Sequence, residues 1–309
     1  MFNSTIVTHL TLGAYFDTGL LKYLFFLILM SLYVWIIISN VLLIVLICVN
    51  RSLHEPMYLF LCSLFVNELS GSTGLFPFLL LQILRDVHTV STSLCFLQNF
   101  FLFSYGGVEY LSLAIMSYDR YLAICHPLQY HTLMTPNRMS MLIALTWLCP
   151  LFLCVIMVCL TRSLLLCGDI VHKVYCDNYS VVKLACSDTT INNIYGLIIV
   201  SFSVFGPVIL ILYSYVWILK VCFSGSKQTR HKAVSTCTPH LASLINFLFG
   251  GCFELLQSRF NMKSVPNVVR ILLSLYWLTC QPLFNPLLYG LNLSKIRILC
   301  KSLLSAQTL

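Results

Sequence analysis

Long apolar runs constrain this chain more than any other feature. Six or more of them reach about 20 residues, the length that an α-helix needs to cross the hydrocarbon core of a bilayer. Only 9% of the residues are charged, against about 25% in soluble domains. Inside a bilayer every backbone polar group needs an internal hydrogen bond, and runs of this length favour helices over barrel strands. The sequence therefore predicts an all-α membrane protein.

Polar breaks between the runs predict seven membrane helices. Pro56 opens the second, where its missing N–H is not needed, and Pro127 ends the third. The seven helices form one domain over residues 24–290, between a tail at 1–23 and a short amphipathic helix within 291–309. The spans are expected at residues 24–49, 57–84, 95–125, 138–160, 191–223, 229–257 and 267–289.

Positive charge gives a weak indication of orientation. Ten of the 18 lysines and arginines lie on the side that contains the C-terminus, and eight lie on the other side. Because cytoplasmic loops carry the excess of these residues, we expect the N-terminus outside and the C-terminus in the cytoplasm. The formal net charge of +8 indicates contact with anionic lipid or an acidic partner. No basic helix or RNA-binding motif points to nucleic acid.

Four cysteines gather on the side expected to be extracellular. Cys95 begins the third span, and Cys167, Cys176 and Cys186 lie in the long link after the fourth. An even set of cysteines in an oxidising compartment predicts two disulfides, and the sequence alone leaves three pairings open. On the same side Asn3 begins a glycosylation sequon and is the expected glycan site.

The inner end of the third span carries Asp119-Arg120-Tyr121. An arginine at a membrane boundary is always charged and seeks a neighbouring carboxylate. We therefore expect Arg120 to pair with Asp119 at rest, as a latch that opens when the sixth span swings outward. An ordinary boundary anchor is the alternative. The other candidates for switching are Tyr215 and Tyr289, near the same end, and Asn285 and Pro286 in the seventh span.

Two carboxylates interrupt the apolar spans. Counted along their helices from the inner end, Glu68 and Glu109 both lie about 16–18 Å deep. Charge at that depth is costly, so intramembrane acids are functional candidates. With Asn40 and Asn285 expected nearby, the oxygen ligands favour a sodium ion. Two neutral acids that share hydrogen bonds are the alternative.

The seventh span is expected to bend at Pro286. A proline removes one helical hydrogen bond, and the side chain of Asn285 is expected to offer a substitute.

The ligand pocket is expected in the outer half of the bundle. Its candidate lining is mostly apolar with a few hydroxyls, as small-molecule pockets usually are. The candidates are Leu102, Phe103, Gly106 and Gly107 on the third span, Ile199 and Ser203 on the fifth, Phe249, Cys252, Phe253 and Leu256 on the sixth, and Leu275, Leu278 and Thr279 on the seventh.

Five short motifs follow one another along the chain. They are LHEPMY at 53–58, MSYDRYLAIC at 116–125, Ser214-Tyr215, KAVSTCTPHL at 232–241 and PLFNPLLY at 282–289. Together they resemble the signature set of odorant receptors, a branch of the rhodopsin-like (class A) G-protein-coupled receptors. The first span departs slightly, with Ser39-Asn40 where the family usually has Gly-Asn.

The resemblance implies a plasma-membrane receptor that binds a small odorant from outside and activates a stimulatory olfactory G protein, raising cAMP. No cofactor beyond a possible Na⁺ is expected, and no enzymatic activity, because no nucleophile–base or metal set converges at one depth. Some relatives carry a His-two-residues-Cys-acid pattern in the long link, but here Lys173 stands in place of the His, so no transition-metal site is expected. The resemblance also implies disulfides between Cys95 and Cys176 and between Cys167 and Cys186. Amine receptors of similar fold carry a carboxylate where this chain has Leu102, so an amine ligand is disfavoured.

Two other functions remain open from the sequence. A transporter could use Glu68 and Glu109 as a proton relay, but it would be expected to show paired broken helices in two repeats, which the sequence lacks. A rhodopsin-like receptor for a hormone, a peptide or a small metabolite fits the same motifs, and only a ligand screen separates it.

Overall fold

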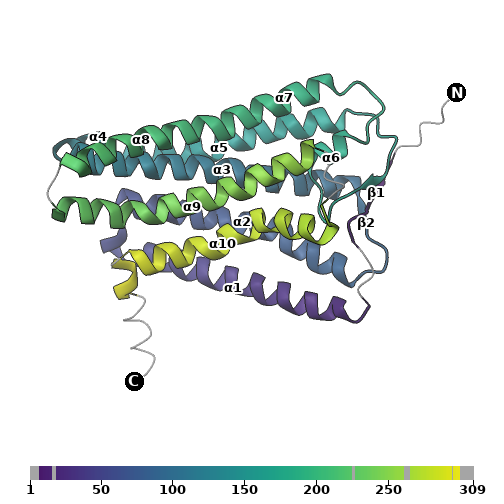
Figure 1. The fold of residues 1–309 in the computed structure, drawn as a ribbon, viewed down its shortest axis with the longest axis horizontal. Coiled ribbons are helices and arrows are strands. Elements are labelled where there is room, and N and C mark those ends of the chain that lie inside the picture. Colours follow the sequence, from purple (N-terminus) through teal and green to yellow (C-terminus); the bar gives the residue numbers. More distant parts are fainter. Residues whose placement is uncertain (1–6, 16–18, 225–226, 261–264, 294, 300–309) are drawn as a thin grey trace.

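The computed structural model describes residues 7–15, 19–224, 227–260, 265–293 and 295–299. Seven long helices form a bundle with roughly aligned axes (Figure 1). Each contains a segment long and apolar enough to cross a membrane, so the predicted all-α seven-helix fold is confirmed. They are α1 (Leu21–Val49), α2 (Pro56–Leu84), α3 (Thr92–Cys125), α5 (Pro136–Arg162), the continuous pair α7 (Thr190–Val200) and α8 (Gly206–Ser224), α9 (Lys227–Arg259) and α10 (Asn267–Asn292).

Two of the helices begin slightly earlier than the apolar pattern indicates because a polar cap residue precedes each. Ser91 caps α3 by accepting a hydrogen bond from the backbone N–H of Leu94, and Thr135 caps α5 in the same way. At the C-terminus α10 continues to Asn292, into the predicted tail, and residues 295–299 form a further helical turn.

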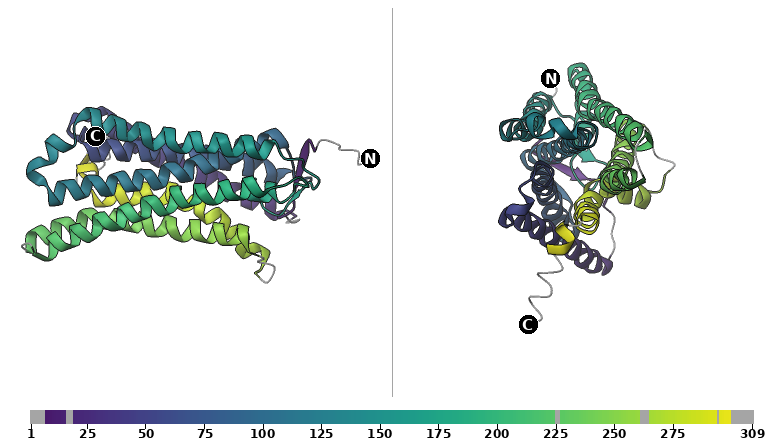
Figure 2. Two further views of the ribbon diagram at one scale, coloured as in Figure 1. Left: turned by 90° about the horizontal axis from the view of Figure 1, so that it is seen from above. Right: turned by 90° about the vertical axis from the view of Figure 1, so that its left-hand side faces the viewer.

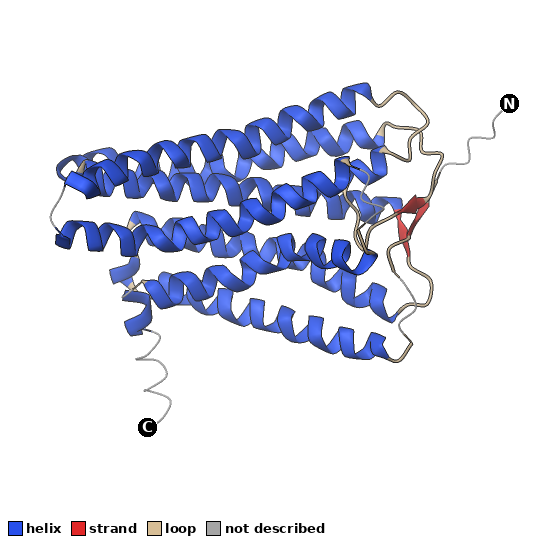
Figure 3. Ribbon diagram, in the orientation of Figure 1, coloured by secondary structure: helices blue, strands red, loops and turns tan. Residues whose placement is uncertain are grey.

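The two ends of the bundle carry different short elements (Figure 3). At the sheet end, β1 (His9–Leu12) pairs antiparallel with β2 (Thr89–Ser91) and parallel with β3 (Ile170–Val171), and α6 (Asn178–Val182) lies nearby. At the α4 end lie η1 (Arg51–Leu53), η2 (Pro127–Gln129) and α4 (Tyr130–Leu133). The sheet was not predicted, because strands of two to four residues are too short for alternation to be recognised.

Helix α3 is the central element of the bundle. In the most apolar 18-residue window of α3, 72% is buried inside the bundle. The corresponding share for the span Thr190–Ser224 is 17%. Helix α3 packs against α2, α5, α8 and α9. Seen end-on, α1 (purple) and α7–α8 (teal to green) lie at the edges of the bundle (Figure 2). Groups on α3 can therefore interact with most of the other helices.

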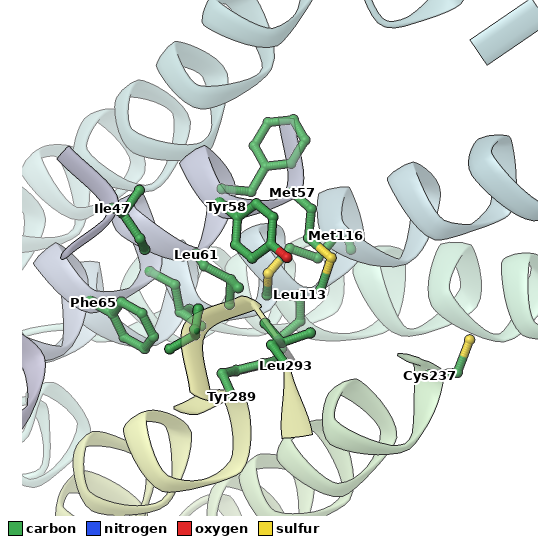
Figure 4. Close-up of a cluster of buried hydrophobic side chains, with 14 of the residues drawn as sticks. Ile47, Met57, Tyr58, Leu61, Phe65, Leu113, Met116, Cys237, Tyr289 and Leu293 are labelled. Atoms are coloured by element: carbon green, nitrogen blue, oxygen red, sulfur yellow. The ribbon is translucent and has the colours of Figure 1, made fainter. Parts of the chain in front are cut away.

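Apolar side chains fill the bundle toward the α4 end. The cluster includes Ile47, Phe65, Met116, Cys237 and Tyr289, contributed by five helices (Figure 4). The outer surface is also apolar, and it exposes large side chains along the helices. In lipid such a surface is compatible with the surroundings, so close packing rather than exclusion of water holds the helices together.

We expect Gly71→Ala to destabilise the bundle. A Cβ on Gly71 of α2 would lie 2.4 Å from Cδ2 of Tyr105 on α3. The Tyr105 side chain is fully buried and its hydroxyl donates to Glu68, so the ring cannot withdraw without losing that contact. Overpacking of this kind costs about 1–3 kcal/mol of unfolding free energy, measurable by thermal unfolding in detergent.

Gly290→Ala is the matched control. Gly290 also lies inside a membrane helix, but a Cβ at this position would meet no heavy atom within 4 Å. Alanine is the better helix former, so this variant should be neutral or slightly more stable. Equal Tm values for the two variants would contradict the steric argument.

Candidate functional site

Polar side chains from three helices meet inside the bundle. Asn285 Nδ2 on α10 donates to Oε1 of Glu68 on α2 (2.5 Å) and to Oε1 of Glu109 on α3 (3.1 Å). The other carboxylate oxygens accept from Asn67 Nδ2 (3.1 Å, to Glu109) and from the Tyr105 hydroxyl (3.2 Å, to Glu68). These donors are neutral. Two buried carboxyl groups bridged by neutral donors need a shared proton or a bound cation to offset their repulsion.

Asn40 does not join this cluster. Pro286 has no N–H, so the carbonyl four residues earlier in α10, that of Pro282, lacks its helical partner. Asn40 Nδ2 on α1 donates to that carbonyl at 3.0 Å. The prediction that Asn285 would supply this substitute was wrong, because the Asn285 amide is bound to the carboxylates.

At the α4 end, Arg120 is paired with Asp119. The guanidinium donates to Oδ2 of Asp119 from Nε (3.0 Å) and from Nη2 (2.5 Å). The hydroxyl of Tyr130, on α4, donates to the other oxygen at 2.7 Å. Burial and the adjacent Asp119 carboxylate raise the pKa of Tyr130, so the phenol remains a donor at neutral pH. The sequence analysis did not single out Tyr130, which follows the end of α3 on a separate short helix.

The remaining switch candidates each have a different environment. The Tyr121 hydroxyl lies 3.0 Å from Nε2 of His126, and the Tyr289 hydroxyl lies 3.2 Å from Nδ1 of His240. The Tyr215 hydroxyl is buried without a hydrogen-bond partner among the described residues. Tyr215 and Tyr289 are therefore not joined through their hydroxyls in this structure. His240 was missed as a partner, although it lies within the KAVSTCTPHL motif.

A cavity of about 140 Å³ lies at the sheet end, between α3, α5, α7, α9 and the loop that follows β3. Of the predicted lining residues, the four on α3 and the two on the fifth span do line it: Leu102, Phe103, Gly106, Gly107, Ile199 and Ser203. Ser203 lies in a π-helical segment, Ser201–Phe205, in which the N–H of Gly206 donates to the carbonyl of Ser201. This wider turn precedes Pro207, which has no N–H to donate.

The predicted face of α9 was wrong. Phe249 and Leu256 are 59% and 47% exposed on the outside of the bundle, and the cavity wall comes instead from Gly251, Glu254 and neighbouring residues. Apolar residues occur all around this helix, so periodicity could not identify its inward face. The four α9 candidates that do not line the cavity are Phe249, Cys252, Phe253 and Leu256.

The predicted residues of α10 also lie off the cavity wall. Leu278 is buried in an apolar cluster with Tyr105 and Phe247, and Leu275 packs against that cluster. The Thr279 hydroxyl donates to the carbonyl of Leu275 within its own helix. Trp277 is the residue that α10 contributes to the cavity.

Two disulfides hold the loop that covers the cavity. Cys95 at the start of α3 is bonded to Cys176, with the Cα atoms 5.4 Å apart. Cys167 is bonded to Cys186 within the loop, with the Cα atoms 5.7 Å apart. These are the pairings that the family resemblance implied. The first one fixes the loop at Cys176 to the N-terminal end of α3.

Buried charges also fasten this loop to α9. Lys173 Nζ pairs with Oε1 of Glu254 on α9 and lies 3.4 Å from Oδ1 of Asp177. Burial disfavours the charged ammonium, but the two carboxylates outweigh that effect and raise the pKa of Lys173. Nearby, Lys183 Nζ donates to the carbonyl of Ser258 at 2.8 Å. The contacts of Lys173 with Glu254 and of Lys183 with Ser258 join residues far apart in the chain, and no local pattern indicates them.

The expected glycan site, Asn3, lies outside the described residues. Across the described residues no three His, Cys, Asp or Glu side chains are placed to hold a metal ion.

Comparisons with known proteins agree with one another. A sequence model of the olfactory receptor family matches residues 29–307. The chain is 36% identical to olfactory receptor 11A1 of Homo sapiens, covering 96% of this chain and 95% of the relative. It is 33% identical to olfactory receptor 6E1 of Mus musculus with the same coverage. Among solved structures, squid rhodopsin superposes with a TM-score of 0.74 at 17% identity, over 93% of this chain and 82% of that one.

Proposed function

The chain belongs to the olfactory receptor family, and on that premise we propose that it binds a small odorant at the sheet end and activates a stimulatory olfactory G protein, raising cAMP. Family membership makes it a receptor rather than an enzyme or a transporter. One observation carries the proposal. A single central helix, α3, lines the cavity with Leu102 and Gly106 and bears the Asp119–Arg120 pair at its other end.

The sheet end faces the outside in this proposal. Both disulfides lie there, and disulfides persist in oxidising compartments. The slight excess of lysine and arginine on the opposite side favours the same orientation. The receptor then lies in the plasma membrane with its N-terminus outside and with Asp119, Arg120 and Tyr121 facing the cytoplasm.

The Asp119–Arg120 pair acts as the latch. With its carboxylate held by Arg120 and by Tyr130, Asp119 keeps the guanidinium beside α3. Occupation of the cavity changes the position of α9, whose wall residues include Glu254, and an outward movement of the inner half of α9 gives the G protein access to Arg120. Tyr215, Tyr289 and the bend at Pro286 accompany that movement.

Arg120→Ala is expected to abolish stimulated cAMP production. The test is a cAMP assay in cells against a panel of volatile and water-soluble compounds, with surface receptor measured in parallel. Arg51→Ala, an exposed arginine at the same end of the bundle, is the control and should respond like the wild type. Equal stimulation in Arg120→Ala and wild type, at equal surface amounts, would rule out the latch.

The buried acid cluster binds a sodium ion in this proposal. Carboxylate oxygens of Glu68 and Glu109 suit a hard cation, which would offset their negative charge. We expect the Tm of the purified receptor to be higher in NaCl than in choline chloride at the same ionic strength. Glu109→Gln should lose that difference. A Tm that is independent of sodium would favour a proton shared by the two acids.

A further inference from the structure

The cavity wall contains a buried amide with no hydrogen-bond partner. Neither Nδ2 nor Oδ1 of Asn99 on α3 has a partner among the described residues, and the side chain is only 1% exposed. Asn99 lies one helical turn from Cys95, whose disulfide brings Cys176 above it, and both Asn99 and Cys176 line the cavity. A buried donor and acceptor left unpaired are costly, so a ligand group that reached this amide from the cavity would satisfy both atoms.

Another asparagine on the same wall differs from Asn99. Asn193 Nδ2 donates to Oγ1 of Thr189 within the fifth span at 3.2 Å. Asn192 Nδ2, on the same wall, is also buried without a partner among the described residues, so Asn99 is distinguished by leaving both of its polar atoms unpaired.

The charged side chains around the cavity balance one another. Asp177 and Glu254 line it and pair with Lys173, and Arg259 lines it with its guanidinium 4.0 Å from the centre of the Tyr179 ring. These four charges sum to zero. A charged ligand would therefore add an unbalanced charge to the wall, and desolvating it would be unfavourable.

The volume and the apolar surface set the size of the occupant. A cavity of about 150 Å³ accommodates a benzene-sized molecule, and this one measures about 140 Å³. Leu102, Phe103 and Ile199 supply apolar wall for the hydrocarbon part of such a molecule.

We propose that the cavity selects a small neutral alcohol or phenol whose hydroxyl donates to Oδ1 and accepts from Nδ2 of Asn99. A hydroxyl is the smallest neutral group that both donates and accepts, which an ether or a hydrocarbon cannot do. This inference rests on the proposed odorant-binding function and adds the chemical class of the ligand.

The test measures the thermal stability of the purified full-length receptor with five probes of similar size. They are benzyl alcohol, benzyl methyl ether, toluene, benzylamine and benzoate. We expect benzyl alcohol to stabilise the wild type at concentrations about tenfold lower than any other probe, because only it satisfies both atoms of the amide. Equal or better stabilisation by any other probe, or no stabilisation by benzyl alcohol, overturns the proposal.

Two variants assign the effect to one side chain. Asn99→Leu should keep its stability without probe, since it removes two unpaired polar atoms, and should lose the preference for the alcohol. Asn292→Leu, at an exposed asparagine of α10 that does not line the cavity, should retain the preference. If Asn99→Leu still preferred the alcohol, the assignment of the hydroxyl to Asn99 would be overturned. If Asn99→Leu failed to fold, the comparison of the five probes on the wild type would still decide whether the cavity selects an alcohol. The stability assay contains no G protein, so it tests ligand binding alone. If benzyl alcohol stabilised the purified receptor but did not raise cAMP in cells, the proposed signalling would be refuted and this inference would stand.

Discussion

Asn285→Leu is expected to lower the free energy of unfolding by about 3–5 kcal/mol. Leucine has the same number of side-chain heavy atoms as asparagine, with the same branching, so the loss comes mainly from chemistry rather than from a cavity. The variant removes the one donor that bridges Glu68 and Glu109, and it leaves the Ser243 hydroxyl without its acceptor. Thermal unfolding of the purified receptor measures the effect.

Two further variants make this prediction specific. Asn292→Leu changes an exposed asparagine of the same helix, whose amide only donates to the carbonyl of Leu288, and should alter stability by less than about 0.5 kcal/mol. Adding Glu68→Gln to Asn285→Leu should restore part of the loss, because one of the two acids is then permanently neutral. If Asn285→Leu, Asn292→Leu and the double variant of Asn285→Leu with Glu68→Gln all unfolded at the same temperature, the acid cluster would not contribute to stability as described.

Cys176→Ser is expected to cost about 2–5 kcal/mol and to remove most receptor from the cell surface. The bond to Cys95 joins residues separated by 81 positions and fixes the loop that covers the cavity to α3. Surface labelling and thermal unfolding report the loss. Cys159→Ser, an exposed free cysteine on α5, is the control and should be close to the wild type.

The two disulfides should also differ from each other. Cys186→Ser opens a loop with a sequence separation of only 19. By the dependence of loop-closure entropy on length, its removal should cost about 1 kcal/mol less than removal of the Cys95–Cys176 bond. A larger loss of stability for Cys186→Ser than for Cys176→Ser would show that the loop closed by the Cys167–Cys186 bond also stabilises the receptor through packing, beyond chain entropy.

The sequence predicted features that depend on one helix at a time. Apolar length placed the seven spans, and the fixed rise per residue placed Glu68 and Glu109 at matching depths, where Asn285 bridges them. The Asp119–Arg120 pair involves neighbours in the chain, so it too could be anticipated. The disulfide pairing came from the family resemblance and not from the residues alone.

Features that depend on how helices rotate against one another could not be predicted. Phe249 was expected in the cavity, but apolar residues occur all around α9, and the helix turns Gly251 and Glu254 inward instead. Asn40 was assigned to the acids, yet it reaches the carbonyl that Pro286 leaves free on α10. Both errors concern which of several possible neighbours a side chain meets, and that depends on packing between segments distant in sequence.

The two lysine contacts between the loop that covers the cavity and α9 hold one end of that helix in place. Lys173 and Lys183 bind Glu254 and Ser258, both near the C-terminal end of α9. A helix held at one end moves by tilting, and the displacement of each residue grows with its distance from the fixed end. Over the 27 residues from Glu254 back to Lys227, about 40 Å of helix, a tilt of about 10° shifts the far end by about 7 Å. Under the proposed function, small adjustments beside an odorant in the cavity would become larger displacements at the α4 end of α9, which the G protein meets.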